Sequence, residues 1–390
     1  MRERRPTTPF RRRRILWWLT TAAVLAVAVV GVAEVLLRAF PHYLPAAMLF
    51  RLHDQAIEAN DLKTRPAPEF GYLWQPRTRD RLEGWQFGFT YTTDEHGFRN
   101  PNPWPDRADI VVIGDSQAFG FGVDDGEVWV RHMAERLPRA RIVNLGVIGA
   151  APQQFPKVFE AFGAPLRPAV VLVAFFPPNA IQMGRLYSEW EADGRQGGFD
   201  QRRFGGSARN GVVETIKDGL RESYALFGLY YALRTATGSS GTVTVEFDGD
   251  RQLHLATTRY GDEARRAENG HPDFEATIEV LEELRAMVEA SGAEMVVVPF
   301  PTKEEVHLPL VGESANALVA PFLAELDRRG IPHLDLTGDL RERAAEGEKL
   351  FLEIDLHPND AGHQLIAEIL IDRLERRAAE LRLSAGSGLR

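Results

Sequence analysis

IVVIGDSQAFGFG, residues 110–122, is the stretch that decides the fold. Its first four residues are apolar and lack the polar/apolar alternation of a half-exposed strand, so they predict a strand buried on both faces of a parallel sheet. Ser116 follows where the chain leaves the carboxyl end of that strand, the edge at which open α/β sheets bind ligands. Gly-Asp-Ser is also ordinary turn chemistry, so the tripeptide alone does not assign a nucleophile.

Further apolar runs alternate with helical patterns along the chain. The runs predict strands at residues 141–145, 169–175, 294–299 and 332–336, and the helical patterns lie at 127–137, 153–162, 274–290 and 315–329. Strand and helix in repeated alternation predict a doubly wound parallel sheet with helices on both faces. We therefore expect a three-layer α/β/α fold, flavodoxin-like, with five parallel strands.

The first 38 residues differ from the rest of the chain. Seven arginines precede residues 15–33, which are nineteen residues without charge or proline, and about twenty apolar residues at helical rise cross a bilayer. Trp17 and Trp18 lie near one end, where interfacial aromatic rings are expected. We predict a cytoplasmic basic tail (1–14) and an uncleaved transmembrane anchor (15–37). The alternative is a signal peptide cleaved near Gly31 and Ala33.

Charge and cysteine usage limit the compartment and the partners. The basic residues before the apolar stretch place the amino terminus in the cytoplasm and the remainder across the inner membrane, in the periplasm or outside the cell. The chain has no Cys, as suits an oxidising compartment. Residues 1–38 hold 8 of the 46 basic and 2 of the 55 acidic residues, which leaves 38 against 53, a net charge of −15. Such an acidic domain is not a nucleic-acid binder.

Composition divides the rest of the chain further. Residues 38–108 are broken by prolines and predict a linker and packing segment with a short strand at 85–93. Residues 109–378 form the predicted α/β domain, and residues 379–390 form a tail. Residues 185–270 interrupt this domain as an insertion that begins with a glycine-rich stretch. An apolar helix is predicted at 212–235, and a hairpin follows, whose strands at 242–247 and 252–256 flank an Asp-Gly turn. The helix packs against the domain or forms a lid or a membrane-facing surface.

Three more polar motifs follow predicted strands. NLGVIGA brings Gly146 and Gly149, where a backbone N–H can approach a ligand closely. FFPPNAI brings Asn179 in a rigid turn, and its amide can donate to an oxyanion or to its own backbone. EIDLHPNDAGH brings Asp355 and His357. A carboxylate beside an imidazole fixes its tautomer, so that the ring can take a proton from a hydroxyl.

The order Ser, Gly, Asn, then Asp and His resembles the SGNH (GDSL) hydrolase superfamily, over roughly residues 110–375. The resemblance implies that Ser116 is the nucleophile, His357 its general base and Asp355 the group that orients His357. It also implies an oxyanion hole made by the backbone N–H groups of Ser116 and Gly149 and by the side chain of Asn179.

Two blocks depart from the usual family pattern. The acid stands two residues before His357 instead of three, as in the periplasmic SGNH-like proteins that O-acetylate exopolysaccharides, and Glu353 or Asp360 are alternative orienting residues. The usual Gly-x-Asn-Asp block is here Pro-Pro-Asn-Ala around Asn179. His363 lies in the closing helix, expected to run to about residue 376, and is interpreted as a capping or packing residue.

Two functions follow from these features. The first is a membrane-tethered, extracytoplasmic serine esterase or O-acyltransferase, which acts through an acyl-enzyme on an acyl ester, by analogy an acetyl ester of an envelope or exopolysaccharide glycan. The second is a non-catalytic scaffold or glycan-binding subunit of an envelope assembly. We expect no cofactor and no metal, because His271, His307 and His333 lack a ligand-like spacing. The expected partners are the substrate, the lipid bilayer at residues 15–37 and proteins of envelope biosynthesis.

Overall fold

The computed structural model describes residues 9–40, 44, 63–83, 87–196, 198–199, 223–236, 241–247 and 251–387. The chain divides into two compact units. The first unit comprises residues 1–52 and 208–240, and the second comprises residues 53–207 and 241–390. Parts of the predicted insertion, including the glycine-rich stretch at 200–211, the start of its helix and the Asp-Gly turn at 248–250, lie outside the described residues.

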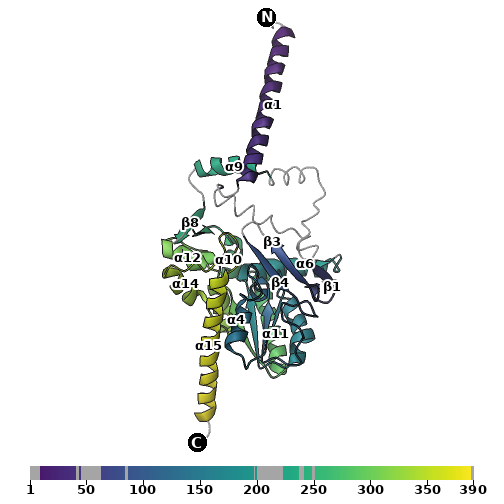
Figure 1. Ribbon diagram of the computed structural model, residues 1–390, viewed down its shortest axis with the longest axis vertical. Coiled ribbons are helices and arrows are strands. Elements are labelled where there is room, and N and C mark those ends of the chain that lie inside the picture. Colours follow the sequence, from purple (N-terminus) through teal and green to yellow (C-terminus); the bar gives the residue numbers. More distant parts are fainter. Residues whose placement is uncertain are drawn as a thin grey trace. The chain divides into compact units, whose positions relative to one another are not determined.

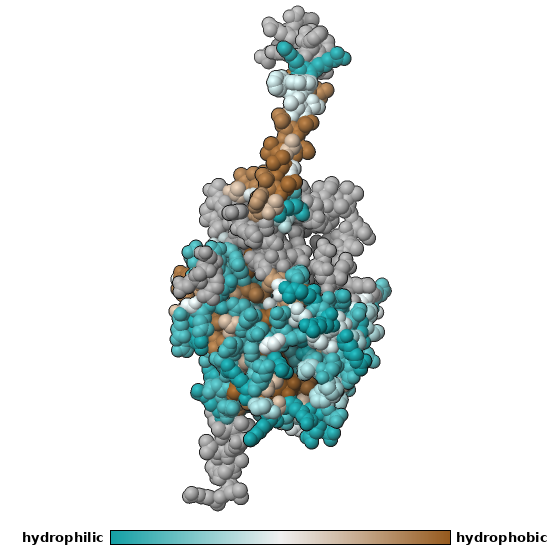
Figure 2. Space-filling view, viewed as in Figure 1, coloured by the Kyte–Doolittle hydropathy of each residue, from teal (hydrophilic) through white to brown (hydrophobic). Residues whose placement is uncertain are grey.

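Two helices make up the described part of the first unit. Helix α1 (Pro9–Ala39) contains a stretch, Arg13–Ala39, that is long and apolar enough to cross a membrane, and none of it is buried inside the protein. Figure 2 shows this apolar surface in brown, beyond the basic residues at the start of the helix. The predicted anchor, 15–37, lies within α1. Helix α9 (Tyr224–Ala236) corresponds to the carboxyl-terminal half of the predicted apolar helix and contacts α1.

A parallel sheet forms the centre of the second unit. Its strands are β5 (Ile110–Gly114), β6 (Ile142–Gly146), β7 (Val170–Phe175) and β10 (Glu294–Pro299), in the order β10-β7-β5-β6. Gly114, the last residue of β5, pairs with Gly146 on one side and Ala174 on the other, so the carboxyl ends of these strands form one edge. The predicted α/β fold class is confirmed.

The predicted fifth strand, at residues 332–336, is reduced to a single parallel bridge between Val297 and His333. The Val297 N–H donates to the Pro332 carbonyl and the Leu334 N–H donates to the Val297 carbonyl, each at about the usual length. Pro332 cannot donate to a ladder, and the next helix begins at Thr337, so the pairing stops after one bridge. The prediction of five full strands is corrected to four strands and this bridge.

Helices cover both faces of the sheet, as the three-layer prediction requires. One face, with Val111 and Val173, packs on α5 (Gln154–Val158), α6 (Pro177–Ala192), α11 (Pro272–Ala290) and α13 (Val319–Arg328). The other face, with Val112 and Leu172, packs on α4 (Trp129–Arg136), α12 (Lys303–His307), α14 (Thr337–Ala345) and α15 (Asp360–Ser387), several of which are labelled in Figure 1. Short helical turns at Phe159–Gly163, Ala164–Leu166 and Leu308–Val311 complete the layers.

Residues 64–92 belong to the core of the second unit. They form two antiparallel pairs, β1 (Thr64–Ala67) with β2 (Gly71–Trp74) and β3 (Arg79–Glu83) with β4 (Gly88–Thr92). Tyr72, Trp74, Phe89 and Tyr91 are fully buried in the same cluster as Val111. Burying a large aromatic ring stabilises a domain by roughly 2–3 kcal/mol, so this segment is more than a linker. The strand predicted at 85–93 is β4.

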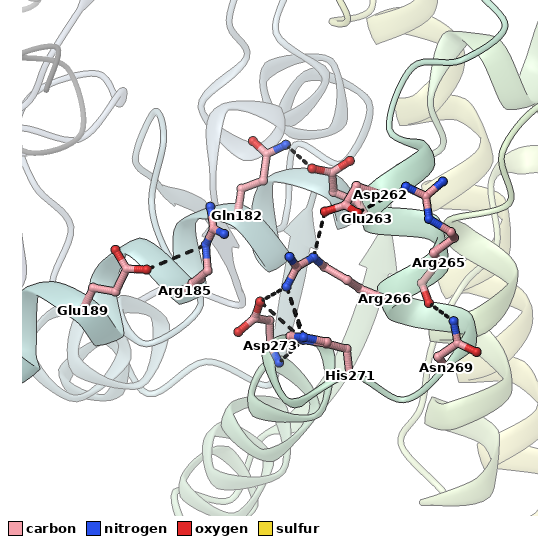
Figure 3. A network of polar contacts seen from close by, with 10 residues as sticks. All are labelled: Gln182, Arg185, Glu189, Asp262, Glu263, Arg265, Arg266, Asn269, His271 and Asp273. Carbon is pink, nitrogen blue, oxygen red and sulfur yellow. Dashed lines mark hydrogen bonds and ion pairs between the residues drawn. The ribbon is translucent and has the colours of Figure 1, made fainter. Parts of the chain in front are cut away.

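The inserted segment is attached to the sheet domain through polar contacts. The hairpin strands β8 (Thr242–Phe247) and β9 (Arg251–Ala256) form as predicted, and α10 (Gly261–Glu268) follows. Figure 3 shows how α10 is held: the Gln182 amide on α6 donates to Glu263 at 2.6 Å, and Arg266 donates to Asp262 at 3.0 Å and to Asp273 at 2.6 Å. The start of α11 and the end of the insertion are therefore held together.

The closing helix is longer than predicted. Helix α15 continues to Ser387 instead of ending near residue 376, and it crosses the predicted tail boundary at 378. Residues 376–383, RRAAELRL, are all helix formers with no Gly or Pro among them, so nothing in the sequence stops the helix there.

Candidate active site

Ser116 lies at the first position of a short helix, α3 (Ser116–Phe119), at the carboxyl end of β5. Asp115 caps this helix, because its carboxylate accepts a hydrogen bond from the Gln117 N–H at 3.0 Å. Gly114 passes so close to the Ala174 carbonyl on β7 that a side chain would collide with it. The sharp exit from the strand therefore requires glycine and directs the Ser116 side chain to the edge of the sheet.

The structure brings Ser116, His357 and Asp355 together. The Ser116 Oγ lies 2.7 Å from the His357 Nε2, and the His357 Nδ1 lies 2.5 Å from an Asp355 oxygen. All three are buried, with 5–7% of their surface exposed. Because the carboxylate accepts the Nδ1 proton, the unprotonated Nε2 faces the hydroxyl and can take its proton. Although 241 positions separate Ser116 from His357, they lie within hydrogen-bond distance.

Asp355 is the carboxylate that contacts the imidazole. Its Oδ1 also accepts the backbone N–H of His357 at 2.8 Å, which fixes the loop in a tight turn. Glu353 instead lies 3.3 Å from the ring of His254, and the hydrogen bond from that ring lowers the pKa of Glu353. Asp360 is exposed at the start of α15. Neither alternative orienting residue contacts His357 within the described chain.

His363 is a packing residue, as predicted. It is almost completely buried, and its Nδ1 accepts the Trp129 backbone N–H at 3.3 Å. Burial holds the pKa of His363 well below its usual value, so the ring stays neutral. A neutral ring that packs against α4 and does not contact Ser116 is not the base.

The predicted oxyanion-hole donors follow three neighbouring strands of the sheet: Ser116 begins α3 after β5, Gly149 lies in the loop after β6, and Asn179 lies in the first turn of α6 after β7. Gly149 has a φ of 69°, a conformation that favours glycine and turns the loop after β6. Within the described residues, neither the Ser116 N–H nor the Gly149 N–H donates to a protein acceptor. Both N–H groups are thus free to donate to a ligand.

Asn179 differs from its predicted setting. It lies in the first turn of α6, which begins at Pro177, because proline is well accommodated at the start of a helix. Its amide Nδ2 donates to an Asp115 oxygen at 3.0 Å and lies 3.5 Å from the Ala150 carbonyl. The amide is therefore held by the residue that precedes Ser116, instead of by its own turn.

Asp115 links the loops of the site. Besides Gln117 and Asn179, it accepts the Phe176 N–H at 3.0 Å, so one carboxylate ties α3 to the connection between β7 and α6. Its complete burial raises its pKa, and these hydrogen bonds oppose the rise. The sequence indicated only turn chemistry for Gly-Asp-Ser, and the structure adds these longer-range contacts of Asp115.

Lys303 is a residue near the site that the sequence did not reveal. Its side chain is fully buried, and its Nζ donates to the carbonyls of Ile354 at 2.7 Å and Glu353 at 3.1 Å, immediately before Asp355. Burial lowers the pKa of Lys303 to about 7. The available signal was the Thr302–Glu305 capping box, which predicts a helix start after β10, at the edge of the sheet that carries the site.

A second buried cation fixes the loop after Ser116. The Arg99 guanidinium donates to the carbonyls of Gly120 and Val123 and to Asp125 at 2.5, 2.7 and 2.8 Å. This loop includes Phe121, whose ring centroid lies 4.6 Å from that of His357. The imidazole therefore contacts the Phe121 ring and, at its Nδ1, Asp355. In the part of the chain that the structure describes, no group of three or more His, Cys, Asp or Glu side chains is placed to hold a metal ion.

The sequence of this region matches a known family. Residues 260–386 match the family described as "SGNH hydrolase-like domain, acetyltransferase AlgX". This region of the chain is therefore similar to an SGNH hydrolase-like domain. The matched residues include Asp355 and His357, whereas Ser116 precedes them. The predicted resemblance to the SGNH superfamily is confirmed, and its fold is one used for ester hydrolysis and acyl transfer.

Solved structures with a similar chain path have low sequence identity. A protein of the lipolytic G-D-S-L family from Veillonella parvula is 14% identical, with 67% of this chain and 96% of that chain covered and a TM-score of 0.34. The psychrotrophic esterase EstA from Pseudoalteromonas sp. is 13% identical, with 70% and 99% covered and a TM-score of 0.34. LAE5, an alpha/beta hydrolase enzyme from the metagenome of Lake Arreo, is 17% identical, with 69% and 95% covered and a TM-score of 0.34. No curated protein matches this chain.

Proposed function

We propose that this protein is a membrane-tethered serine esterase or O-acyltransferase that acts outside the cytoplasm. The observation that carries the proposal is the chain of short contacts from Ser116 through His357 to Asp355, with separations of 2.7 and 2.5 Å. The match to an SGNH hydrolase-like domain supports the same class of reaction.

In the proposed first half-reaction, the Ser116 Oγ attacks the carbonyl carbon of an acyl ester while His357 takes the hydroxyl proton. The negative charge that develops on the carbonyl oxygen is stabilised by the N–H groups of Ser116 and Gly149 and by the Asn179 amide. When the tetrahedral intermediate collapses, His357 gives its proton to the departing alcohol, and the acyl group stays on Ser116 as an ester.

In the proposed second half-reaction, water or a sugar hydroxyl attacks the acyl-enzyme, again with His357 as the base. Attack by water gives hydrolysis, and attack by a sugar gives transfer. The acetyltransferase description of the matched family favours an acetyl group, and we propose a glycan of the envelope or an exopolysaccharide as the acceptor or donor. Incubation with an acetyl donor and such a glycan, followed by quantification of free acetate and acetylated glycan, separates the two outcomes.

The tether is proposed from α1, whose Arg13–Ala39 stretch has the length and composition of a membrane span. The arginines before it favour an amino terminus in the cytoplasm of a single-pass inner-membrane protein. A reporter that is active only in the cytoplasm, fused after Arg390, should be inactive. Activity of that reporter would reverse the proposed orientation.

The catalytic proposal is tested with a fluorophosphonate probe and a chromogenic acetyl ester on the full-length chain in detergent. We expect labelling and turnover to disappear in Ser116→Ala and to persist in Ser188→Ala, which alters an exposed serine on α6. The second candidate function, a glycan-binding or scaffold subunit, is favoured by the altered block around Asn179, whose amide already donates to Asp115. Absence of both labelling and turnover in the unaltered protein would support that second function.

A further inference from the structure

Helix α9 exposes apolar side chains for which the described protein offers no cover. Leu229 and Leu233 are 58% and 63% exposed, and they lie four residues apart, on the same side of the helix. Apart from α1 and Phe40, the large hydrophobic side chains exposed in the described residues are these two and, in the second unit, Leu310 and Val311.

The start of α9 is attached to the last turns of α1. The Glu34 carboxylate accepts hydrogen bonds from the Ser223 hydroxyl and the Ala225 N–H, both at 2.9 Å, and so satisfies donors at the amino end of α9. Arg38 donates to Glu34 at 2.7 Å, and its guanidinium lies 4.6 Å from the ring centroid of Tyr224. The beginning of α9 is thereby fixed at the level of Glu34.

Glu34 marks the end of the apolar stretch of α1. Residues 15–33 carry no charge, and Glu34 is the first charged residue after them. If α1 crosses a bilayer, Glu34 and Arg38 therefore lie where the acyl chains meet the headgroups. Figure 1 shows α9 running crosswise to α1 from this end. If α1 spans a bilayer, α9 therefore runs along the membrane plane.

We propose that α9 is a membrane-surface helix that lies in the plane of the bilayer, with Leu229 and Leu233 inserted at the boundary between headgroups and acyl chains. The sequence of α9, YALFGLYYALRTA, has one charged residue in thirteen, as suits a helix whose apolar face is buried in lipid. The inference rests on the proposed membrane tether. The protein would then contact the membrane at two places, through α1 and through α9, whose start lies nearly 190 positions after Glu34 in the sequence.

The test uses the full-length protein in vesicles of phosphatidylethanolamine and phosphatidylglycerol. Because the chain has no Cys, single nitroxide labels can be attached at Leu229→Cys and Leu233→Cys without background. Val27→Cys, in the middle of α1 and 73% exposed, is the lipid reference, and Glu283→Cys, exposed on α11, is the water reference. Collision rates with oxygen, which concentrates in lipid, and with a water-soluble nickel chelate are compared at the four positions.

We expect labels at 229 and 233 to collide with nickel roughly tenfold less than the label at 283 and to approach the oxygen value of 27, since such helices bury their apolar face about 5–10 Å deep. Water-like values at 229 and 233, with a lipid-like value at 27, would overturn the proposal and leave the tether intact. Low collision rates with both reagents would show that protein covers the face and would also overturn it. A water-like value at 27 would remove the tether itself.

Discussion

Replacing Asp355 with Asn tests which acid orients His357. One Asp355 oxygen accepts both the Nδ1–H of the imidazole, at 2.5 Å, and the backbone N–H of His357, at 2.8 Å. The amide of Asn is nearly the same size, and its oxygen can keep both contacts as a neutral acceptor. The change therefore removes the negative charge beside the ring and leaves the turn in place.

The expected loss follows from the charge. Without the carboxylate, the imidazolium that forms when His357 takes the Ser116 proton is no longer stabilised, and Nδ1 is less strongly favoured as the protonated nitrogen. The same replacement in a Ser-His-Asp triad lowers kcat by about 10⁴, which corresponds to about 5 kcal/mol at 1.36 kcal/mol per tenfold. We expect a decrease of this size for Asp355→Asn.

Glu353→Gln and Asp360→Asn are the matched controls. Glu353 pairs with His254 and Asp360 is exposed, so each change should lower kcat less than about tenfold, the range of a displaced neighbouring charge. Rates are measured at saturating acetyl ester after thermal unfolding has shown that the variants are folded, with Ser116→Ala as the baseline. If Asp355→Asn keeps a tenth of the activity, or if Glu353→Gln falls to the Ser116→Ala level, the assignment of the acid is wrong.

Three other changes give separate tests. Asn179→Ala should lower kcat by about 10²–10³ with little change in KM, as expected for one oxyanion donor, and an unchanged kcat would remove Asn179 from the hole. Gly146→Ala would place a methyl group against the Phe119 nitrogen in α3, so it should lower the free energy of unfolding by about 1–3 kcal/mol in a melting experiment. In the control, Gly126→Ala, the added methyl group meets nothing within 4 Å, so the stability should not change. Burial lowers the pKa of His307 from 6.5 to about 4. The unfolded state therefore binds a proton at a higher pH than the folded state does, and the free energy of unfolding should fall as the pH drops from 6.5 to 4. His307→Leu should reduce this fall in the free energy of unfolding by up to about 3 kcal/mol, as measured in melting curves at several pH values. If the variant loses as much stability between pH 6.5 and 4 as the unaltered protein does, this explanation is wrong.

The parallel strands and most of the helices could be predicted because their signals are local. A fully buried strand such as β7 needs an uninterrupted apolar run, and the sequence VVLVAF shows it directly. A full fifth strand was predicted from the apolar residues of 332–336, but only one bridge forms there. Pro332 on one side and the helix that begins at Thr337 on the other leave no room for a longer strand. Helix α6 was missed because its two leading prolines were interpreted as a turn, whereas proline also begins helices.

The candidate site was predictable where its residues are close in sequence and where the family pattern fixes their order. Asp355 and His357 are two positions apart, and Ser116 stands in a Gly-Asp-Ser motif. Lys303 and Arg99 could not be assigned in this way. Each binds backbone carbonyls of a distant loop, and a carbonyl is present at every position, so no residue type in the sequence records the pairing.

The interaction between Asp115 and Asn179 shows why the altered asparagine block can keep its amide in place. In this chain two prolines precede Asn179, so the neighbouring residues of the usual block cannot position the side chain. Asp115 accepts from both the Phe176 N–H and the Asn179 amide at 3.0 Å, and it also caps the helix that begins at Ser116. Because one buried carboxylate holds both the helix that begins at Ser116 and the Asn179 amide, the distance between Ser116 and Asn179 depends on Asp115 instead of on the sequence next to Asn179. Loss of Asp115 should therefore displace both groups at once.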